Sequence, residues 1–364
     1  MPTHPAVVTV TPRGKLEILE VPTLTPKENQ VKIRVDWIAS TPLNLHQADG
    51  HLLVTPPQIL GGGLAGTVLS LGPDVKRLRV GDRVFGFAWR SNEEKPHQVY
   101  VVVPENLLAR VPETEEYAGE QGMRRAATVS DSFVTAWHSL VTYLGLELPW
   151  PKREGYEPPK RDERVLVWGA SSSSGSYTVQ VLKWAGYKNI LATASPKHHA
   201  ALKEMGAAEV YDYRDPAVVE NILKGGEVRY VLDSIGSVDG SVTPISKIVR
   251  RGAIVAVLLP VIIKDASEEE APIYTFDVTG SVNWEEGVTA LGVRTHSYLD
   301  NELHAEKLQP EIMPTLLQEG AIRPTNQKII EGNTLLERAQ NALDTLRRKE
   351  VSGERLVWRI AEAQ

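Results

Sequence analysis

The second half of the chain alternates apolar runs with segments of helical spacing, and this alternation limits the possible folds more than any other feature. RVLVWG, NILATAS and EVYDY are typical of strands, and each is followed by a segment with helical periodicity. Gly186 and Gly206 follow two of these helical segments, and Pro196 lies near the first turn of one. Two more strand-like runs, RYVLDSIG and GAIVAVLL, come next. This order predicts a doubly wound parallel sheet of the α/β class.

The first 110 residues instead predict a β-rich domain. QVKIRVDWIAS alternates apolar and polar side chains, as a half-buried strand does, and further short strand-like runs follow between Gly and Pro turns. A chain of 364 residues is too long for one ordinary core. We therefore expect one domain over residues 1–125, completed by 300–364, and a second over 126–299. Residues 146–164, rich in Pro and charge, should form an exposed loop.

Composition excludes several classes of function. The net charge is -6, from 40 basic and 46 acidic residues, so nothing indicates a nucleic-acid or membrane surface. The chain has no cysteine, which removes disulfides, thiolate metal sites and cysteine nucleophiles. MPTHPAVVTV does not resemble a signal peptide, and the most apolar segment, residues 252–263, is shorter than the ~20 residues of a membrane span. We expect a cytoplasmic protein.

The turn after the first strand of the alternating region is rich in serine. Its sequence, GASSSSG, keeps Gly169 and Gly175 and places Ser171, Ser172, Ser173 and Ser174 between them. Backbone N–H groups and a helix N-terminus bind phosphate, and serine hydroxyls can add donors. The full G-x-G-x-x-G pattern is missing, so a plain helix cap without a ligand is the alternative. The position of the turn favours a dinucleotide.

The end of the next strand favours NADPH over NADH. An NAD enzyme usually has an acid there to bind the ribose 2′-hydroxyl, but this chain has Thr193 at that place. Ser195, Lys197 and His198 can instead donate to a 2′-phosphate, and Tyr213 could flank the adenine. The alternative is a set of solvated polar residues at a strand end.

Several stretches of sequence, spread in order along nearly the whole chain, resemble the zinc-independent branch of the medium-chain dehydrogenase/reductase superfamily. They include GGGLAGTVLSLGPDVKRLRVGDRVFG, VLVWGASSSSG, ATASPKH, GAAEVYDYR and VSGERLVWRI. The Pro-rich stretch after YLGLELPWP is similar to fungal trans-acting enoyl reductases and ToxD-like proteins, which partner polyketide synthases or act in secondary metabolism. The resemblance implies a GroES-like substrate domain and a Rossmann cofactor domain.

The same resemblance shows that metal ligands are missing. Zinc-dependent relatives have His-Glu where this chain has Gly62 and Gly63, and all of their metal-binding cysteines are absent. A catalytic zinc needs three protein ligands, so we expect no metal. The three successive glycines, Gly61 to Gly63, either reshape a pocket or form a tight turn, and the turn is favoured.

The resemblance also implies site residues by position. TPLNLH stands where the family has Asn-Pro-x-Asp-x-Lys, which leaves the proton donor open. The residues expected near the nicotinamide or elsewhere along the cofactor are Leu43, Asn44, Leu45, His46, Pro196, Leu258, Val282, Asn283, Val351 and Ser352. Those expected to line the substrate pocket are Phe133, Val134, Thr135, Ala136, Trp137 and His138.

These features together predict hydride transfer from NADPH to an activated C=C bond of an enoyl thioester or enone. His46, His138 or solvent would deliver the proton, and Thr135 would orient the nicotinamide or a substrate carbonyl. For each histidine a packing or surface role is the alternative, and for Thr135 the alternative is a helix residue without a role in the reaction. A polyketide synthase is a candidate partner. Two other functions stay open: a quinone or carbonyl reductase on the same scaffold, and an accessory protein that has lost the chemistry.

Overall fold

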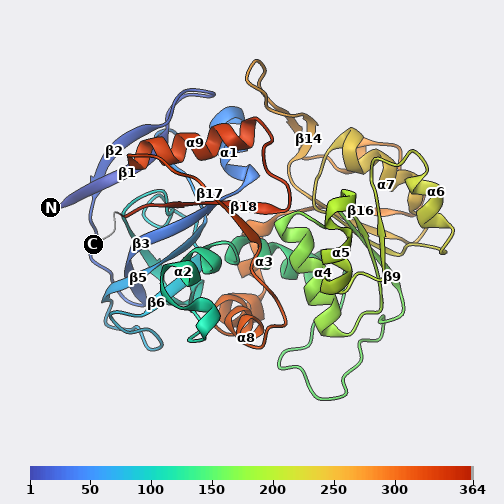
Figure 1. The fold of residues 1–364 in the computed structure, drawn as a ribbon, viewed down its shortest axis with the longest axis horizontal. Coiled ribbons are helices and arrows are strands. Elements are labelled where there is room, and N and C mark those ends of the chain that lie inside the picture. The colour runs from blue at the N-terminus through green and yellow to red at the C-terminus, as the bar shows by residue number, and fades with distance from the viewer. Residues whose placement is uncertain (362–364) are drawn as a thin grey trace. The chain divides into compact units, whose positions relative to one another are not determined.

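The computed structural model describes residues 1–361, which divide into two compact units (Figure 1). Unit 1 contains Met1–Asp131, Ala266–Pro272 and the segment that begins at Asp300. Unit 2 contains Ser132–Asp265 and Ile273–Leu299. Unit 1 therefore extends past residue 125, where the sequence pattern placed the boundary, and it takes in a short segment from the middle of the second domain.

Specific contacts explain these bounds. Helix α2 (Gly119–Ala127) packs against strands β3, β5 and β6 of unit 1. Arg13 donates to the carbonyl oxygens of Ser267 at 3.1 Å and of Glu268 at 2.6 Å, and these bonds tie the inserted segment to unit 1. Contacts between residues so distant in sequence leave no local pattern, so the sequence could not place these boundaries.

Unit 1 is built on two sheets. In the larger sheet the strands lie in the order β17-β18-β3-β5-β6-β8, and β7 also pairs with β3; in the smaller sheet the order is β2-β1-β4. The strands are β1 (Thr3–Thr9), β2 (Glu17–Pro22), β3 (Gln30–Ser40), β4 (Gln58–Ile59), β5 (Gly63–Leu71), β6 (Arg83–Phe87), β7 (Tyr100–Pro104), β8 (Leu108–Arg110), β17 (Asn326–Ile329) and β18 (Glu354–Arg359).

The alternation read from QVKIRVDWIAS predicted β3 correctly. Val31, Ile33 and Val35 are fully buried, whereas the residues between them are half-buried, because neighbouring side chains of a strand point to opposite faces. The C-terminal strand β18 pairs antiparallel with β3, with Leu356 opposite Ser40. The end of the chain thus completes the sheet of unit 1.

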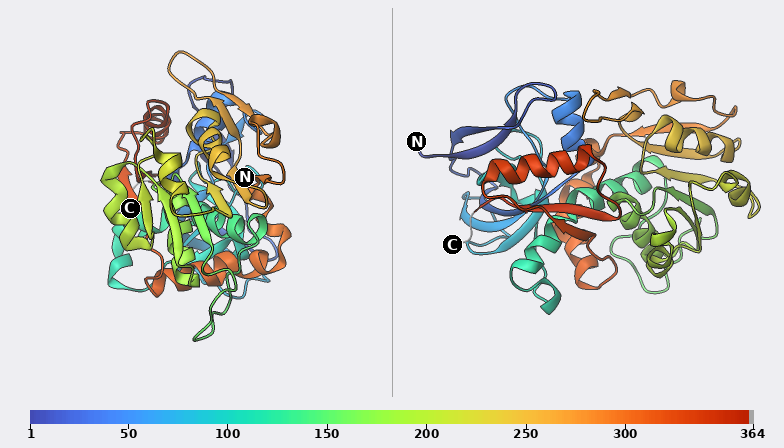
Figure 2. Two further views of the ribbon diagram at one scale, coloured as in Figure 1. Left: turned by 90° about the vertical axis from the view of Figure 1, so that its right-hand side faces the viewer. Right: turned by 45° about the horizontal axis from the view of Figure 1, so that its top comes forward.

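Unit 2 contains the predicted doubly wound sheet. Its six parallel strands lie in the order β11-β10-β9-β12-β13-β16, between helices that cover both faces (Figure 2). The strands are β9 (Arg164–Trp168), β10 (Asn189–Thr193), β11 (Glu209–Tyr211), β12 (Tyr230–Asp233), β13 (Ile254–Leu258) and β16 (Thr289–Val293); β14 (Val261–Lys264) and β15 (Ile273–Thr275) form a separate hairpin. The central strands are almost continuously apolar because both faces of a parallel sheet are covered.

The α-helices of the described chain connect these strands or flank them. They are α1 (Pro42–Gly50), α2, α3 (Ser130–His138), α4 (Ser173–Ala185), α5 (His199–Met205), α6 (Val218–Leu223), α7 (Thr243–Ile248), α8 (Met313–Gln318) and α9 (Leu335–Arg347). The helix predicted to begin near Pro196 starts as a 3-10 turn, Pro196–His198, before α5. Within residues 1–361, no helix combines the length and the apolar character that crossing a membrane requires.

The segment between Tyr143 and Arg164 contains no helix or strand and forms the long green loop of Figure 1. Most of its residues are exposed, but Leu146, Leu148 and Pro158 are buried. Lys152 lies 5.3 Å from the ring centroid of Trp184 on α4, and Tyr156 donates to Glu147 at 2.6 Å. Apolar anchors and local polar contacts therefore hold both ends of the loop on unit 2.

His97 is a deeply buried histidine of unit 1. Its side chain is 3% exposed, its ring lies edge-on to Trp358 with centroids 4.9 Å apart, and neither ring nitrogen bonds to another of residues 1–361. Burial lowers the pKa of His97 from 6.5 to about 3. As the pH falls, the unfolded chain takes up this proton before the folded chain does. The resulting stability is complete above pH 6.5 and is lost as the pH falls toward 3.

We predict that His97→Leu removes part of the acid sensitivity of folding. Because one unit of pKa difference corresponds to about 1.4 kcal/mol, His97 should make the native protein about 3 kcal/mol less stable at about pH 4 than at pH 7. Urea unfolding at both pH values measures this difference, which should shrink in His97→Leu and persist in the control His296→Leu, a change at an exposed histidine. An unchanged pH dependence in His97→Leu would contradict the assignment.

Candidate functional site

The serine-rich turn lies at the carboxyl edge of the parallel sheet, beside its central strand. It connects β9 to α4, and from β9 the chain builds β10 and β11 on one side and β12, β13 and β16 on the other. The strand order therefore reverses next to this turn. Ligands of open α/β sheets bind at such a reversal, outside the carboxyl ends of the strands.

Two glycines allow α4 to begin very close to the end of β9. A Cβ atom at position 175 would lie 2.6 Å from the carbonyl oxygen of Gly169 and 2.8 Å from the Cα of Ala170, both of which are backbone atoms that cannot rotate away. Gly169 has a φ of +76°, in the left-handed region. The space around the turn thus requires glycine at 175, and its backbone favours glycine at 169.

The four serines of the turn have different roles. Ser172 is the N-cap of α4, and its hydroxyl accepts a hydrogen bond from the N–H of Gly175 at 3.0 Å. The hydroxyls of Ser171, Ser173 and Ser174 have no partner among the described residues, and these side chains are half-buried. The first amides of a helix have no acceptor within it. Ser173 and Ser174 therefore offer both amide and hydroxyl donors at the positive end of a 13-residue helix.

Thr193, at the end of β10, fixes the turn from one side. Its hydroxyl accepts from the N–H of Gly169 at 3.0 Å, and its carbonyl oxygen accepts from the N–H of Ala170 at 2.9 Å. The side chain is fully buried. The residue at the place expected for a ribose-binding acid thus stabilises the glycine turn, a role that its position in the sequence did not indicate.

The residues predicted to bind a 2′-phosphate follow β10, and Tyr213, predicted to flank the adenine, follows β11, its neighbour in the sheet. Ser195 is half-buried, whereas Pro196 and Lys197 are exposed, and the Lys197 ammonium has no partner among residues 1–361. His198 is half-buried at the end of the 3-10 turn. The two strand ends bring the predicted groups to one edge of the sheet.

An additional cation, missed in the sequence, lies at this edge. Tyr213, 44% exposed, has the Arg214 guanidinium 5.7 Å from its ring centroid. Arg214 also donates to both carboxylate oxygens of Asp212, at 3.0 and 3.1 Å, and these hydrogen bonds lower the pKa of Asp212. The sequence YDYR could have indicated this cation, because it places an arginine directly after a tyrosine. Stacking of an arginine on an aromatic ring is a common surface contact.

Asp233, at the end of β12, is a buried acid that the sequence did not single out. One carboxylate oxygen accepts from the N–H groups of Ile235 at 2.9 Å and Gly236 at 3.1 Å, and the other accepts from the Ser241 hydroxyl at 2.6 Å. Burial raises the pKa of Asp233 to about 6, against the effect of these three donors, so the carboxylate is charged at neutral pH. It fixes the conformation of the turn after β12.

The turn after β12 lies against the glycine turn and the end of β13. A Cβ atom on Gly169 would lie 2.5 Å from side-chain carbons of Ile235, and one on Gly236 would lie 2.5 Å from the carbonyl oxygen of Leu258. Leu258, predicted to touch the cofactor, is therefore at this edge of the sheet. Val282 and Asn283 were also predicted to touch the cofactor. Val282 packs against the hydrophobic core that includes residues of α6 and α7, and Asn283 is exposed.

The residues predicted to line a substrate pocket lie on α3 and are buried. Phe133 packs edge-on to Tyr177 of α4 with ring centroids 6.2 Å apart, and Trp137 lies 5.8 Å from Trp184. Val134 and Ala136 are also fully buried. These contacts favour a packing role for the two aromatic residues.

Thr135 and His138 of α3 bond within unit 2. The Thr135 hydroxyl lies 3.2 Å from that of Thr295, and the Nδ1 of His138 lies 3.0 Å from the hydroxyl of Thr142. Thr142 also follows His138 by one helical turn, so the bond fixes the imidazole orientation. Thr295 was not identified from the sequence, because the contact spans a long stretch of chain.

The remaining predicted residues belong to unit 1. In α1, the Asn44 side chain accepts from the N–H of Thr41 at 2.9 Å and so caps the helix, while Leu45 is buried and Leu43 and His46 are half-buried. Val351 is half-buried and Ser352 is exposed in the segment between α9 and β18. The capping role of Asn44 follows from its place three residues after Thr41.

The geometry of unit 2 fits an anionic dinucleotide. The N-terminus of α4 presents free amides and hydroxyls, glycine provides the close approach that a pyrophosphate needs, and Lys197 supplies a cation at the neighbouring strand end. Within the described part of the chain, no group of three His, Asp or Glu side chains is arranged to hold a metal ion.

Comparison with known proteins gives the following similarities. Residues 27–113 match the model of the alcohol dehydrogenase GroES-like domain. The chain is 33% identical over 261 residues to the trans-enoyl reductase tazE of Aspergillus terreus, covering 68% of this chain and 81% of that protein. It is 28% identical over 340 residues to lovC of the same species, the enoyl reductase component of lovastatin nonaketide synthase, covering 91% and 89%. It is 33% identical over 232 residues to the dehydrogenase azaJ of Aspergillus niger, covering 61% of this chain. This match spans 64% of azaJ, less than two thirds of its length.

Solved structures show the same fold. The quinone oxidoreductase of Coxiella burnetii has a TM-score of 0.72 at 20% identity, over 99% of this chain and all of that chain. The CurK enoyl reductase also has a TM-score of 0.72, at 18% identity, over 98% and 99% of the two chains. At these identities the likeness describes the fold.

We predict that Gly175→Ala disrupts the turn after β9. The added methyl group would meet backbone atoms, so the turn must shift, and overpacking of this kind costs about 1–3 kcal/mol of folding free energy. Dinucleotide binding, measured by calorimetry with NADPH, should weaken by about tenfold or more. The control Ser174→Ala, at the neighbouring half-buried position, should keep the fold and change the affinity less. Equal affinity of Gly175→Ala and the unaltered protein would contradict this account.

Proposed function

The chain belongs to the zinc-independent medium-chain dehydrogenase/reductase superfamily, in its fungal trans-enoyl reductase subgroup, and from this premise we propose that it is an NADPH-dependent enoyl reductase. The proposed reaction transfers a hydride to the β-carbon of a C=C bond conjugated to a carbonyl and a proton to the α-carbon. The product is the saturated acyl compound, and the coenzyme leaves oxidised. The substrate class we propose is an enoyl thioester or an enone.

The observation that carries the proposal is the geometry at the N-terminus of α4. Gly175 lets the helix begin against the end of β9, and the amides and hydroxyls of Ser173 and Ser174 remain available there. A pyrophosphate is the ligand for which such a site is suited. We propose that these two residues bind the pyrophosphate and that Ser172, whose hydroxyl is occupied as the cap, acts by holding the helix start in place.

A nicotinamide cofactor follows from the family, and its phosphorylated form is our proposal. Lys197 is an exposed cation without a partner among the described residues, at the end of the strand next to β9, and Ser195 precedes it. Thr193, at the position where an acid would bind the ribose of NADH, has its hydroxyl committed to Gly169. We propose that Lys197, Ser195 and His198 bind the 2′-phosphate and that Tyr213 flanks the adenine.

When bound, NADPH supplies the hydride. The residues of the chain bind and orient the reactants: the pyrophosphate donors of α4 position the coenzyme, and Thr135 is proposed to orient the nicotinamide or a substrate carbonyl. His46, His138 or solvent delivers the proton to the α-carbon. The bond between His138 and Thr142 holds the imidazole in place.

The partner and the place of action are also proposals. The relative lovC is the enoyl reductase component of lovastatin nonaketide synthase. By analogy we propose that this chain reduces a carrier-bound enoyl intermediate in fungal secondary metabolism, in the cytoplasm, with a polyketide synthase as its partner.

Steady-state oxidation of NADPH with three substrates tests the function. An enoyl thioester or an enone should be reduced faster than a quinone of similar size. Preference for the quinone would favour the alternative reductase on the same scaffold. Tight NADPH binding without turnover of any of the three would favour an accessory protein, and no NADPH binding at high micromolar concentration would remove the proposal.

We predict that Lys197→Glu weakens NADPH binding by about tenfold to a hundredfold, because it replaces a charge-assisted donor by a like charge. Binding of NADH, which lacks the 2′-phosphate, should change little. The matched control is Lys203→Glu, an exposed lysine on α5 that changes the net charge equally. Calorimetric titration with both coenzymes measures the effect. Equal losses in the two variants would mean that Lys197 acts only through the overall charge.

A further inference from the structure

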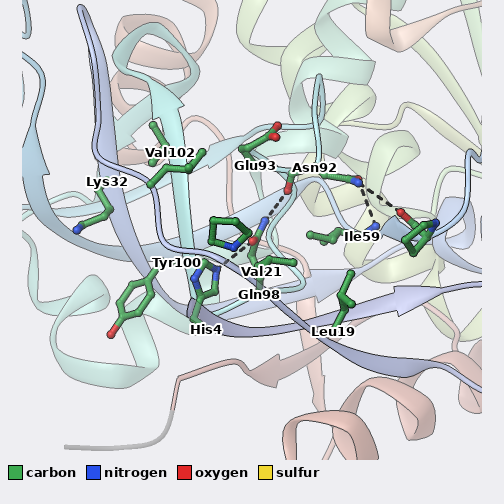
Figure 3. Close-up of a pocket in the computed structure, with 13 residues that line it drawn as sticks. His4, Leu19, Val21, Lys32, Ile59, Asn92, Glu93, Gln98, Tyr100 and Val102 are labelled. Carbon is green, nitrogen blue, oxygen red and sulfur yellow. Dashed lines mark hydrogen bonds between the residues drawn. The ribbon is translucent and has the colours of Figure 1, made fainter. Parts of the chain in front are cut away.

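Unit 1 contains a cavity of about 220 Å³ between the hairpin β1–β2 and the strands β3 and β7 (Figure 3). It is lined entirely by residues of unit 1 and shares none of them with the serine-rich turn of unit 2. Apolar side chains form most of its wall: Leu19, Val21, Leu24, Ile59 and Val102, together with Pro22 and Pro57.

The polar groups inside the cavity already have partners. The side-chain NH₂ group of Gln98 donates to the carbonyl oxygens of Asn92 at 2.6 Å and Lys95 at 2.7 Å, so its oxygen must face His4. His4 therefore donates from Nε2 to Gln98 at 3.1 Å and accepts at Nδ1 from the Thr23 hydroxyl at 2.8 Å. Both His4 and Gln98 are at least 95% buried. With all of their hydrogen bonds made, they offer a ligand mainly carbon surface.

The free donors lie at one side of the cavity. Figure 3 shows Lys32 of β3 and Tyr100 of β7 together on that side. Neither the Lys32 ammonium nor the Tyr100 hydroxyl bonds to another of residues 1–361, whereas the neighbouring Arg34 is neutralised by Asp36 at 2.8 Å. Lys32 is half-buried. These two groups suit an anionic head group.

One carboxylate also lines the cavity. Glu93 is exposed, so water and salt screen its charge more than that of the half-buried Lys32. The electrostatic potential near Lys32 and Tyr100 therefore favours an anion over a cation. A cavity of 220 Å³ corresponds to about seven non-hydrogen atoms, at about 30 Å³ each.

We propose that this cavity binds a medium-chain carboxylate, with its alkyl chain against Leu19, Val21, Ile59 and Val102 and its carboxylate on Lys32 and Tyr100. The alkyl chain of octanoate, with about seven carbon atoms, matches the volume of the cavity. The site does not depend on the proposed reductase activity, since it belongs to unit 1 alone.

Titration of the full-length chain with octanoate, octanol and octylamine tests the proposal, with ligand-observed NMR as the readout. Octanoate should bind most tightly and octylamine most weakly. Lys32→Met should weaken octanoate binding by about tenfold and leave octanol binding unchanged, because a charge-assisted hydrogen bond is lost. The control Lys27→Met removes an exposed lysine outside the cavity and should change neither.

A second variant and a competition experiment complete the test. Leu19→Trp fills the cavity from a position that is 40% exposed, so the fold should tolerate it, and it should weaken all three ligands. NADPH should leave octanoate binding unaltered. The proposal is overturned if octanoate binds Lys32→Met or Leu19→Trp as well as the unaltered chain, if octylamine binds more tightly than octanoate, or if NADPH displaces octanoate. Octanoate binding in a chain that does not bind NADPH would contradict the proposed reductase alone.

Discussion

The structure of the carboxyl edge of the parallel sheet in unit 2 depends on the close approach between the first turn of α4 and the end of β9. Backbone atoms at 2.6 and 2.8 Å from the Cβ position of residue 175 leave room for glycine alone. The neighbouring strands then hold the turn from two sides. Thr193 of β10 accepts hydrogen bonds from the amides of Gly169 and Ala170. Ile235, in the turn after β12, packs against Gly169, and the carboxylate of Asp233 holds that second turn by accepting from its amides. The buried contacts of three adjacent strands thus determine where the α4 amides point.

This arrangement explains why a serine-rich turn can keep the shape of a glycine-rich one. The two glycines remain at the positions where the backbone conformation or the available space requires them. The positions between them do not need glycine, and serine there adds a cap at Ser172 and free donors at Ser173 and Ser174. The departure from G-x-G-x-x-G therefore changes the donors while the helix start keeps its place.

The sequence predicted the features that depend on local patterns. Period-two alternation identified β3, the strand and helix order identified the parallel sheet, and Gly186 marked the end of α4, where it has the left-handed φ of a helix cap. The bonds of Thr193 to the turn after β9 could not be predicted, because they join segments that only the folded sheet brings together. Asp233 was not singled out although its partners, Ile235, Gly236 and Ser241, lie close in sequence, because an acid before a turn is a common surface pattern. The contacts of Phe133 and Trp137 with α4 were not predicted for a similar reason: the helical spacing of α3 does not indicate which side meets α4. Their place in a substrate pocket stays a prediction.

The triple glycine of unit 1 shows how the family scaffold is packed without the usual metal-binding pair. Cβ atoms at Gly61 and Gly62 would lie 2.6 Å from His97 and 2.7 Å from Phe87, so aromatic side chains fill the space beside both. Beside Gly63 lies Asp131, whose carboxylate pairs with the buried Arg355 at 2.8 and 3.0 Å. A glutamate at position 63 would bring a second negative charge to a carboxylate that one guanidinium already neutralises. Breaking a buried pair of this kind is strongly destabilising, so the Asp131–Arg355 pair favours an uncharged residue at position 63.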